Sequence, residues 1–340
     1  MAFHYPGGGP PSFGRYIELT PIARDALRLS GIGEGQKLVI YTDTQRNKDH
    51  IDAFYAAALT LGAETCVVMT VPRNDPDRTP LELAMTAMAG ADMVMDLSSI
   101  SWIYTPQFSE LMRKGVRILS CMSGTDTIVK MAPREDIARR ARVGGQFIHD
   151  GSTIRVTSDA GTDITMPKSG RKGVSQDGLV PEPGGWDNFP SAQCACAPLE
   201  DQARGVLVVN PGDIILPLKR IVSTPVRISV DRGRITGIEG EADAALLRSW
   251  FEGWRDPNSY VIAHIGFGCD PRAEIAAMQL MEWESYAGGV MVAFGANDGA
   301  FLGGKNRATS HIDIVLLNAN FYVDNELLVD HGGFAHPDLE

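Results

Sequence analysis

Long apolar segments are missing from this chain of 340 residues. No run reaches the roughly 18 consecutive apolar residues that a transmembrane helix needs, so we expect no membrane span. The N-terminal stretch Met-Ala-Phe-His-Tyr-Pro lacks both the basic and the apolar region of a secretory signal peptide. The five cysteines are an odd number and mostly scattered, which suits a reducing compartment. We therefore expect a cytoplasmic protein.

Two common motifs are also absent. Cys194 and Cys196 form the one close cysteine pair, and no second pair follows at zinc-site spacing, so a structural zinc site is not expected. No G-x-G-x-x-G follows the first expected strand, so a dinucleotide-binding fold is not supported. The net charge of −11 argues against nucleic-acid and anionic-membrane partners. An anionic substrate would need a local cation, such as a bound metal, Lys305, Arg307 or Arg272.

The first half of the chain alternates between helical and strand patterns. Apolar residues at helical spacing predict helices over residues 21–30, 48–61, 80–88, 106–114 and 134–142. Short apolar runs predict strands over residues 37–42, 64–70, 91–96 and 116–121. Strands that alternate with helices indicate a parallel sheet covered on both faces, so we expect a doubly wound α/β domain over residues 1–150.

The second half has a different pattern. Strands follow one another without intervening helices over residues 152–158, 205–209, 226–230 and 234–239, and again over 311–317, 321–323 and 326–329. Helices are expected over 241–253 and 271–286, and a long Gly/Pro-rich loop over 167–190. We expect an α+β domain over residues 151–340 that carries the metal site.

His311 and Asp313 are the most informative residues of the chain. They lie two apart on an expected strand, so both side chains point to one face, while Ile312 and Ile314 point to the other. His264 is the best candidate for a third ligand. Two histidines and one carboxylate with open positions are typical of mononuclear non-haem Fe(II) oxygenases, although the same set can hold Zn²⁺.

Several longer motifs carry a resemblance to a known family. They are Glu-Pro-Gly-Gly-Trp-Asp at 182–187, Gly-Asp-Ile-Ile-Leu-Pro at 212–217, His-Ile-Gly-Phe-Gly at 264–268, Asp-Pro-Arg-Ala at 270–273, and the segment 303–313. Together they resemble the 2,5-dihydroxypyridine 5,6-dioxygenase family, which shares a superfamily with the thermophilic leucyl aminopeptidases (aminopeptidase T). The resemblance implies Fe(II) held by His264, His311 and Asp313, and a homo-oligomer.

Three positions depart from the pattern of that family. Ala293 stands where the family has a serine at the iron, Tyr104 where it has a histidine, and Asn188 where it has a second pocket histidine. A site that hydrogen-bonds one ring substituent rejects analogues strongly, so the substrate can differ from 2,5-dihydroxypyridine itself.

Five further side chains are candidates for the site. Tyr104 can exchange a proton with the ring and Asn188 can hydrogen-bond a ring substituent, so both are candidate catalytic residues. Lys305 can pair with an anionic group of the substrate. Asp187 and Glu182 can bind the substrate or orient a ligand histidine. Each of the five also has a structural explanation, such as a turn, a helix start or a solvated surface position.

We therefore expect a mononuclear non-haem Fe(II) dioxygenase that opens a hydroxylated N-heteroaromatic ring with O2. The metal relays electrons from ring to oxygen, so no organic cofactor is required. One alternative is a metal-dependent, aminopeptidase-like hydrolase or amidase on the same fold, with Zn²⁺ in place of iron. A second alternative is a non-catalytic binding protein on a retained fold.

Overall fold

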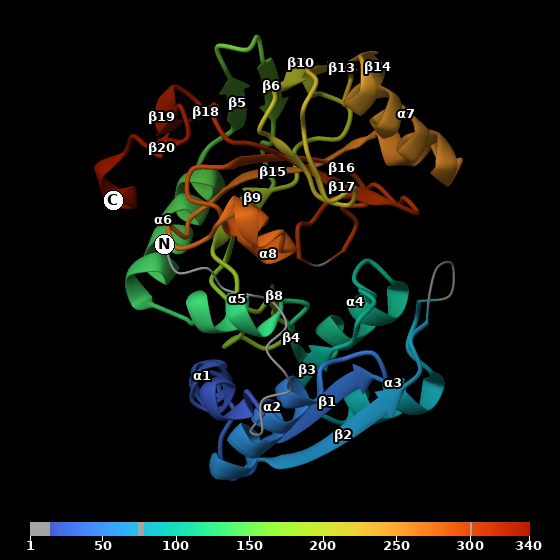
Figure 1. The fold of residues 1–340 in the computed structure, drawn as a ribbon, viewed down its shortest axis with the longest axis vertical. Coiled ribbons are helices and arrows are strands. Elements are labelled where there is room, and N and C mark those ends of the chain that lie inside the picture. Colours follow the sequence, from blue (N-terminus) through green and yellow to red (C-terminus); the bar gives the residue numbers. More distant parts are fainter. Residues whose placement is uncertain (1–13, 74–77, 300) are drawn as a thin grey trace.

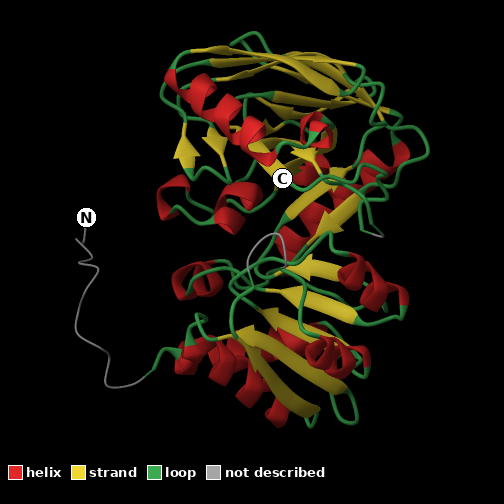
Figure 2. Cartoon of the chain, turned by 90° about the vertical axis from the view of Figure 1, so that its right-hand side faces the viewer, coloured by secondary structure: helices red, strands yellow, loops and turns green. Residues whose placement is uncertain are grey.

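A computed structural model describes residues 14–73, 78–299 and 301–340 of the chain. A parallel sheet with its helices forms one half of the molecule, and two antiparallel sheets form the other (Figure 1). The view turned by 90° shows the same division (Figure 2). None of the helices in the described ranges combines the length and apolar composition needed to cross a bilayer.

The first sheet has five parallel strands in the order β2-β1-β3-β4-β8. The strands are β1 (Lys37–Asp43), β2 (Glu64–Thr70), β3 (Met93–Leu97), β4 (Arg117–Ser120) and β8 (Trp186–Asn188). The helices of this part of the chain are α1 (Tyr16–Leu29), α2 (Lys48–Thr60), α3 (Glu82–Ala89), α4 (Pro106–Arg113), α5 (Thr125–Lys130) and α6 (Glu135–Asp150).

Strand β1 shows why helices cover both faces of this sheet. Its residues alternate in direction, so Leu38 and Ile40 pack with α1 and α2. Val39 and Tyr41 point the other way and pack with α3 and α4. A parallel sheet buried on both faces is the arrangement that the alternating helices and strands predicted.

The second half contains an eight-stranded sheet in the order β14-β13-β10-β6-β5-β18-β19-β20 and a seven-stranded sheet in the order β12-β11-β17-β16-β15-β9-β7. The strands of the eight-stranded sheet are β5 (Thr153–Thr157), β6 (Asp163–Pro167), β10 (Arg204–Val209), β13 (Val226–Asp231), β14 (Arg234–Gly240), β18 (Asn320–Val323), β19 (Glu326–Asp330) and β20 (Gly333–Phe334). Those of the seven-stranded sheet are β7 (Val174–Gln176), β9 (Gln193–Cys196), β11 (Ile214–Ile215), β12 (Arg220–Ile221), β15 (Ile262–Gly268), β16 (Val290–Gly295) and β17 (His311–Leu316).

One continuous core joins these two sheets. Val156 and Leu207 of the eight-stranded sheet share it with Phe267 and Ile312 of the seven-stranded sheet. Helix α7 (Ala242–Trp254) and helix α6 also contribute buried side chains to it. The mixture of sheets and helices agrees with the expected α+β character.

The division expected at residue 150 stays a prediction, and two elements cross it. Helix α6 lies before residue 150 but packs into the core of the second half. Strand β8 lies after residue 150 but pairs with β4 of the first sheet. The chain therefore passes between the halves more than once.

Two expected elements of the second half were wrong. The segment 271–286 is not one helix, because Met278 has a left-handed backbone (φ 53°), and only the turn Ile275–Ala277 and helix α8 (Leu280–Ser285) form there. The segment 167–190 is not simply a long loop, because it holds β7 and β8. These strands have three residues each, too few to show a period of two in the sequence.

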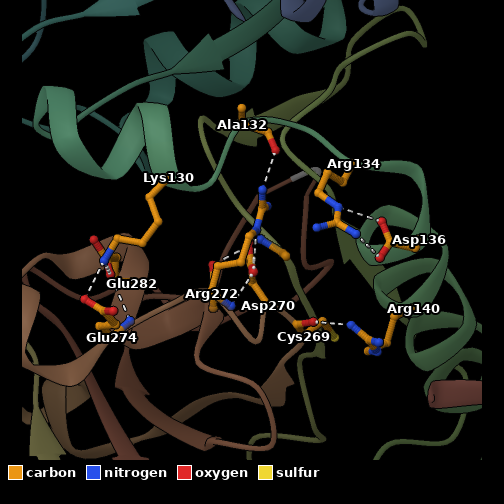
Figure 3. A network of polar contacts seen from close by, with 12 residues as sticks. Lys130, Ala132, Arg134, Asp136, Arg140, Cys269, Asp270, Arg272, Glu274 and Glu282 are labelled. Atoms are coloured by element: carbon orange, nitrogen blue, oxygen red, sulfur yellow. Dashed lines mark hydrogen bonds and ion pairs between the residues drawn. The ribbon is translucent and has the colours of Figure 1, made fainter.

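A polar network joins the two halves beside the cavity described below (Figure 3). The carboxylate of Glu282 on α8 is 1% exposed and accepts hydrogen bonds from the Thr127 hydroxyl (2.6 Å), the Lys130 ammonium (2.7 Å) and the backbone N–H of Glu274 (2.8 Å). Thr127 and Lys130 belong to α5. Nearby, Arg272 binds both carboxylate oxygens of Asp270 and donates to the carbonyl of Ala132.

Replacing Lys130 should weaken this junction. Lys130→Met leaves the buried carboxylate of Glu282 without its cation, and an unpaired buried charge is costly. We expect the free energy of unfolding to fall by about 1–3 kcal/mol, measured by urea denaturation. Lys114→Met removes an exposed ion pair with Glu110 on α4 and should leave this free energy nearly unchanged. Equal stability of the two variants would contradict the assigned role of Lys130.

Candidate metal centre

Three neighbouring strands carry the candidate metal ligands. His264 lies on β15, while His311 and Asp313 lie on β17, and β16 runs between these two strands. The pairing of β15 with β16 shifts register between Ile262 and Ile265, and His264 lies within this irregular stretch. Such an irregularity re-aims a side chain, and here it turns His264 toward Asp313 across the middle strand.

The ligand atoms of these three side chains converge. The Nε2 atom of His264 is 2.8 Å from Oδ1 of Asp313, and Nε2 of His311 is 3.4 Å from the same oxygen. One ligand atom from each residue lies within 4.8 Å of the others. The two imidazole rings are stacked, with centroids 5.1 Å apart. The expected trio is thus brought together by the fold.

The donor set fits a divalent metal ion. The Nδ1 atom of His311 lies 2.8 Å from the carbonyl of Ala296, which can only accept, so Nδ1 carries a proton and Nε2, which faces Asp313, is the nitrogen that would bind a metal ion. Burial alone would raise the pKa of Asp313. The charges of His311 and His264 and their hydrogen bonds to this carboxylate outweigh burial and hold that pKa well below its usual range. The buried Nδ1 atom of His264 has no hydrogen-bond partner among the described residues, so Nε2 is the one nitrogen of this ring that faces the other two ligands.

The middle strand β16 carries small residues opposite two of the ligands. Ala293 is paired with Asp313 and Gly295 with His311, so these small residues stand between the ligands. Residues directly opposite on neighbouring antiparallel strands share a face. Ala293 therefore borders the site, at the position where a serine was expected from the resemblance, but its methyl group cannot ligate a metal.

A cavity of about 470 Å³ opens beside the three ligands. One wall comes from the carboxyl ends of the parallel strands, with Asp96 of β3, Ser120 of β4 and Asn188 of β8. The opposite wall contains the ligands and Glu284 of α8. Ligands of open parallel sheets bind at this edge, and the volume suits a small organic molecule.

Tyr104 lies against the metal site. Its ring centroid is 5.1 Å from that of His311, with an angle of 34° between the planes. Two contacts fix the loop around Tyr104: Thr105 caps α4, and the Trp102 indole donates a hydrogen bond to Asp96. The backbone of Tyr104 itself is left-handed, with φ +66°. Burial, with the negative charge of Asp313, raises the pKa of Tyr104 far above its usual range. The hydroxyl therefore stays protonated and can donate, but it is a poor base.

Of the four remaining predicted site residues, some line the cavity and others lie away from it. Asn188 lines the cavity as expected. Asp187 is buried, but its carboxylate accepts hydrogen bonds from the backbone N–H groups of residues 177, 178 and 188 and from the side chain of Gln176, rather than from a ligand histidine. Lys305 lines a separate surface hollow with Glu200, and Glu182 is exposed. Lys305 and Glu182 are therefore not among the residues that line this cavity.

The sequence did not point to Glu284, which the fold places in the cavity wall. Its Oε2 accepts a hydrogen bond from Gln193 (3.0 Å). Burial raises the pKa of Glu284 to about 8, the charge of Asp313 adds to the rise, and the bond from Gln193 opposes it. No motif marks this residue, because it lies within the segment that the sequence predicted to be a regular amphipathic helix.

Two histidines and one carboxylate at the wall of a small-molecule cavity are typical of a mononuclear metalloenzyme. The comparisons with known proteins specify the class further: the model of the 2,5-dihydroxypyridine 5,6-dioxygenase family matches residues 18–336, so the chain belongs to this family. The resemblance stated from the motifs is confirmed.

Relatives of known name agree. The chain is 30% identical to the 2,5-dihydroxypyridine 5,6-dioxygenase of Pseudomonas putida KT2440, over 94% of this chain and 97% of the relative. The solved structure of the 2,5-dihydroxypyridine dioxygenase from Pseudomonas putida KT2440 has a TM-score of 0.88 at 28% identity, covering 96% and 99% of the two chains. AmpT from Thermus thermophilus has a TM-score of 0.61 at 14% identity, covering 95% and 100%, which shows a shared fold only.

Removal of one imidazole tests the metal centre. His311→Ala should lower metal affinity by more than about 100-fold, since loss of a direct ligand should exceed the 10–100-fold effect of losing a supporting hydrogen bond. Metal content after dialysis, measured by mass spectrometry, checks this. His331→Ala, at an exposed histidine paired with Asp330, should keep full metal content. A His311→Ala protein with wild-type metal content would refute the assigned ligand set.

Proposed function

We propose that this protein is a mononuclear non-haem Fe(II) dioxygenase that opens the ring of 2,5-dihydroxypyridine or a closely related hydroxylated N-heterocycle. The observation that carries the proposal is the convergence of His264, His311 and Asp313 at the wall of a cavity of about 470 Å³. Membership of the dioxygenase family supports the reaction class. By the same resemblance we expect a homo-oligomer, and the odd number of scattered cysteines favours the cytoplasm.

The three ligands would hold Fe(II), which supplies the pathway for electrons from the ring to dioxygen and leaves coordination positions open. The chain's own residues perform the other tasks. Asn188 and the protonated hydroxyl of Tyr104 offer donors to the oxygen or nitrogen atoms of the substrate. Ile103 and Phe301 give the cavity apolar wall area that limits water around the bound ring.

The proposed substrate range follows from the donors of the cavity. Asn188 and Tyr104 replace two expected histidines, so the cavity offers an amide and a phenol where imidazoles were expected. An amide cannot exchange protons near neutral pH, whereas an imidazole can. We infer that the recognised ring keeps its hydroxyl groups but is held by neutral hydrogen bonds, which allows a substrate related to 2,5-dihydroxypyridine but not identical to it.

A hydrolase of the aminopeptidase type is the second candidate, because the fold is shared with AmpT. A two-metal peptidase needs further ligands. Across residues 14–73, 78–299 and 301–340, His264, His311 and Asp313 form the only group of three or more such side chains with converging ligand atoms. This observation favours the mononuclear reading. The non-catalytic alternative is disfavoured by a ligand set that is complete.

Oxygen consumption tests the reaction. The protein, loaded anaerobically with Fe(II), should consume about one O2 per 2,5-dihydroxypyridine or related hydroxypyridine, since both oxygen atoms enter the product of a dioxygenase. An oxygen electrode and the absorbance of the ring measure both quantities. The Zn²⁺-loaded protein is the matched control and should consume none, because Zn²⁺ has no redox chemistry. Hydrolysis of a leucine anilide without oxygen uptake would favour the peptidase instead.

Metal retention should depend on pH. Histidine binds a metal only as the neutral imidazole, so protons compete with the ion as the pH falls. Burial alone would lower the pKa of His311, but Asp313 outweighs it and raises that pKa, so we expect metal content after gel filtration to be full at alkaline pH and to fall as the pH drops through the imidazole range. Metal content that is unchanged down to the carboxylate range would argue against imidazole ligands.

A further inference from the structure

Glu284 stands where the two halves of the protein meet. It lies on the short helix α8, two residues after Glu282, which is tied to Thr127 and Lys130 of α5 (Figure 3). Glu282 faces the first half, whereas Glu284 lines the cavity that holds the metal ligands. The anchoring of Glu282 therefore also limits the freedom of Glu284.

A chain of hydrogen bonds fixes the orientation of the Glu284 carboxyl. Asp187 accepts hydrogen bonds from three backbone N–H groups and from Nε2 of Gln176 (3.0 Å). The Oε1 of Gln176 then accepts from Nε2 of Gln193 (2.9 Å), which also donates to Oε2 of Glu284 (3.0 Å). Oε2 of Glu284 is thus occupied by a donor, and Oε1 remains for a proton.

The groups that face Glu284 come from several elements. Asp313 and His311 of β17 change the pKa of Glu284 through their charges, and Gln193 of β9 donates a hydrogen bond to it. The charge of Glu284 in turn raises the pKa of Tyr104. The negative charge of Asp313 and burial both disfavour the carboxylate, which is why the pKa of Glu284 rises to about 8. A carboxyl in the cavity wall, with one oxygen held by Gln193 and the other not engaged in that bond, is placed for general acid–base work on a bound ring.

Other side chains of the cavity are less suited to accept a proton. The Tyr104 hydroxyl already carries one at neutral pH. Both oxygens of Asp96 accept hydrogen bonds, one from Ser98 and the other from Ser120 and Trp102. Asn188 has no basic atom in this pH range. Asp313 belongs to the metal ligands.

We propose that Glu284 is a catalytic residue that accepts the proton of the ring hydroxyl when that oxygen binds beside His264, His311 and Asp313. The O–H bond breaks, its electron pair stays on the ring oxygen, and the proton moves to Oε1 of Glu284, which becomes a neutral carboxylic acid. Gln193 is the positioning residue for this carboxyl. The inference rests on the proposed function, and it defines the substrate class as rings with an ionisable hydroxyl.

Proton counting during binding tests this role without turnover. 2,5-Dihydroxypyridine is titrated anaerobically into the metal-loaded protein, at a pH above about 8 so that Glu284 starts ionised, in buffers of different ionisation enthalpy. In the wild type the ring proton stays on the protein, so little is released to the buffer. Glu284→Gln should release about one proton more per bound ring, by proton linkage, and its turnover should fall about 10²–10⁴-fold.

Matched variants separate this role from a structural one. Asp213→Asn alters another carboxyl whose pKa is raised by burial but which lies outside the cavity lining, and should keep the wild-type proton count. Glu284→Asp should restore the proton count in part. Gln193→Leu should lower kcat while the proton stays on the protein, as expected for positioning.

The outcomes are distinct. A wild-type proton count or wild-type turnover in Glu284→Gln would overturn the role of Glu284 as proton acceptor. Loss of metal from Glu284→Gln would overturn it as well, by making this carboxylate a ligand. If the metal-loaded wild type neither binds nor oxidises any hydroxypyridine, the proposed function itself fails, and the inference fails with it.

Discussion

The register of three antiparallel strands is the constraint on which the site depends. Strand β16 pairs Ala293 with Asp313 and Gly295 with His311, and the irregularity in β15 turns His264 toward the same place. A shift by one residue in the pairing of β17 would turn its two ligands into the core and bring isoleucines to the site. The buried side chains of Ile312 and Ile314 oppose such a shift, because they are held between the two sheets of the second half.

The cavity depends on both halves of the molecule. The parallel sheet supplies Ser120 and Asn188 at the carboxyl ends of its strands, and the second half supplies the ligands and Glu284. The polar contacts of Glu282 with α5 hold these two walls together. The junction between the halves and the cavity wall therefore share one short helix, since a loosened junction would also move the Glu284 carboxyl that lines the cavity.

The expectations from sequence succeeded where a local pattern carries the information. The alternation of His311, Ile312, Asp313 and Ile314 showed which side chains share a face, and the structure confirms it. The helix expected over 271–286 was wrong, because a left-handed residue at Met278 interrupts it. The positions of Lys305 and Glu182 outside the cavity lining depend on how loops fold over the sheets, which no periodicity reports.

The sequence by itself determined the kind of chemistry: the ligand types, their spacing on a strand and the family motifs. These are properties of neighbouring residues, so a linear pattern can show them. The tertiary structure decided the electrostatic environment of the cavity. Glu284 acquires its raised pKa from burial and from Asp313, and its orientation from Gln193. Such effects act between residues far apart in the chain, and they arise only when packing excludes water from between them.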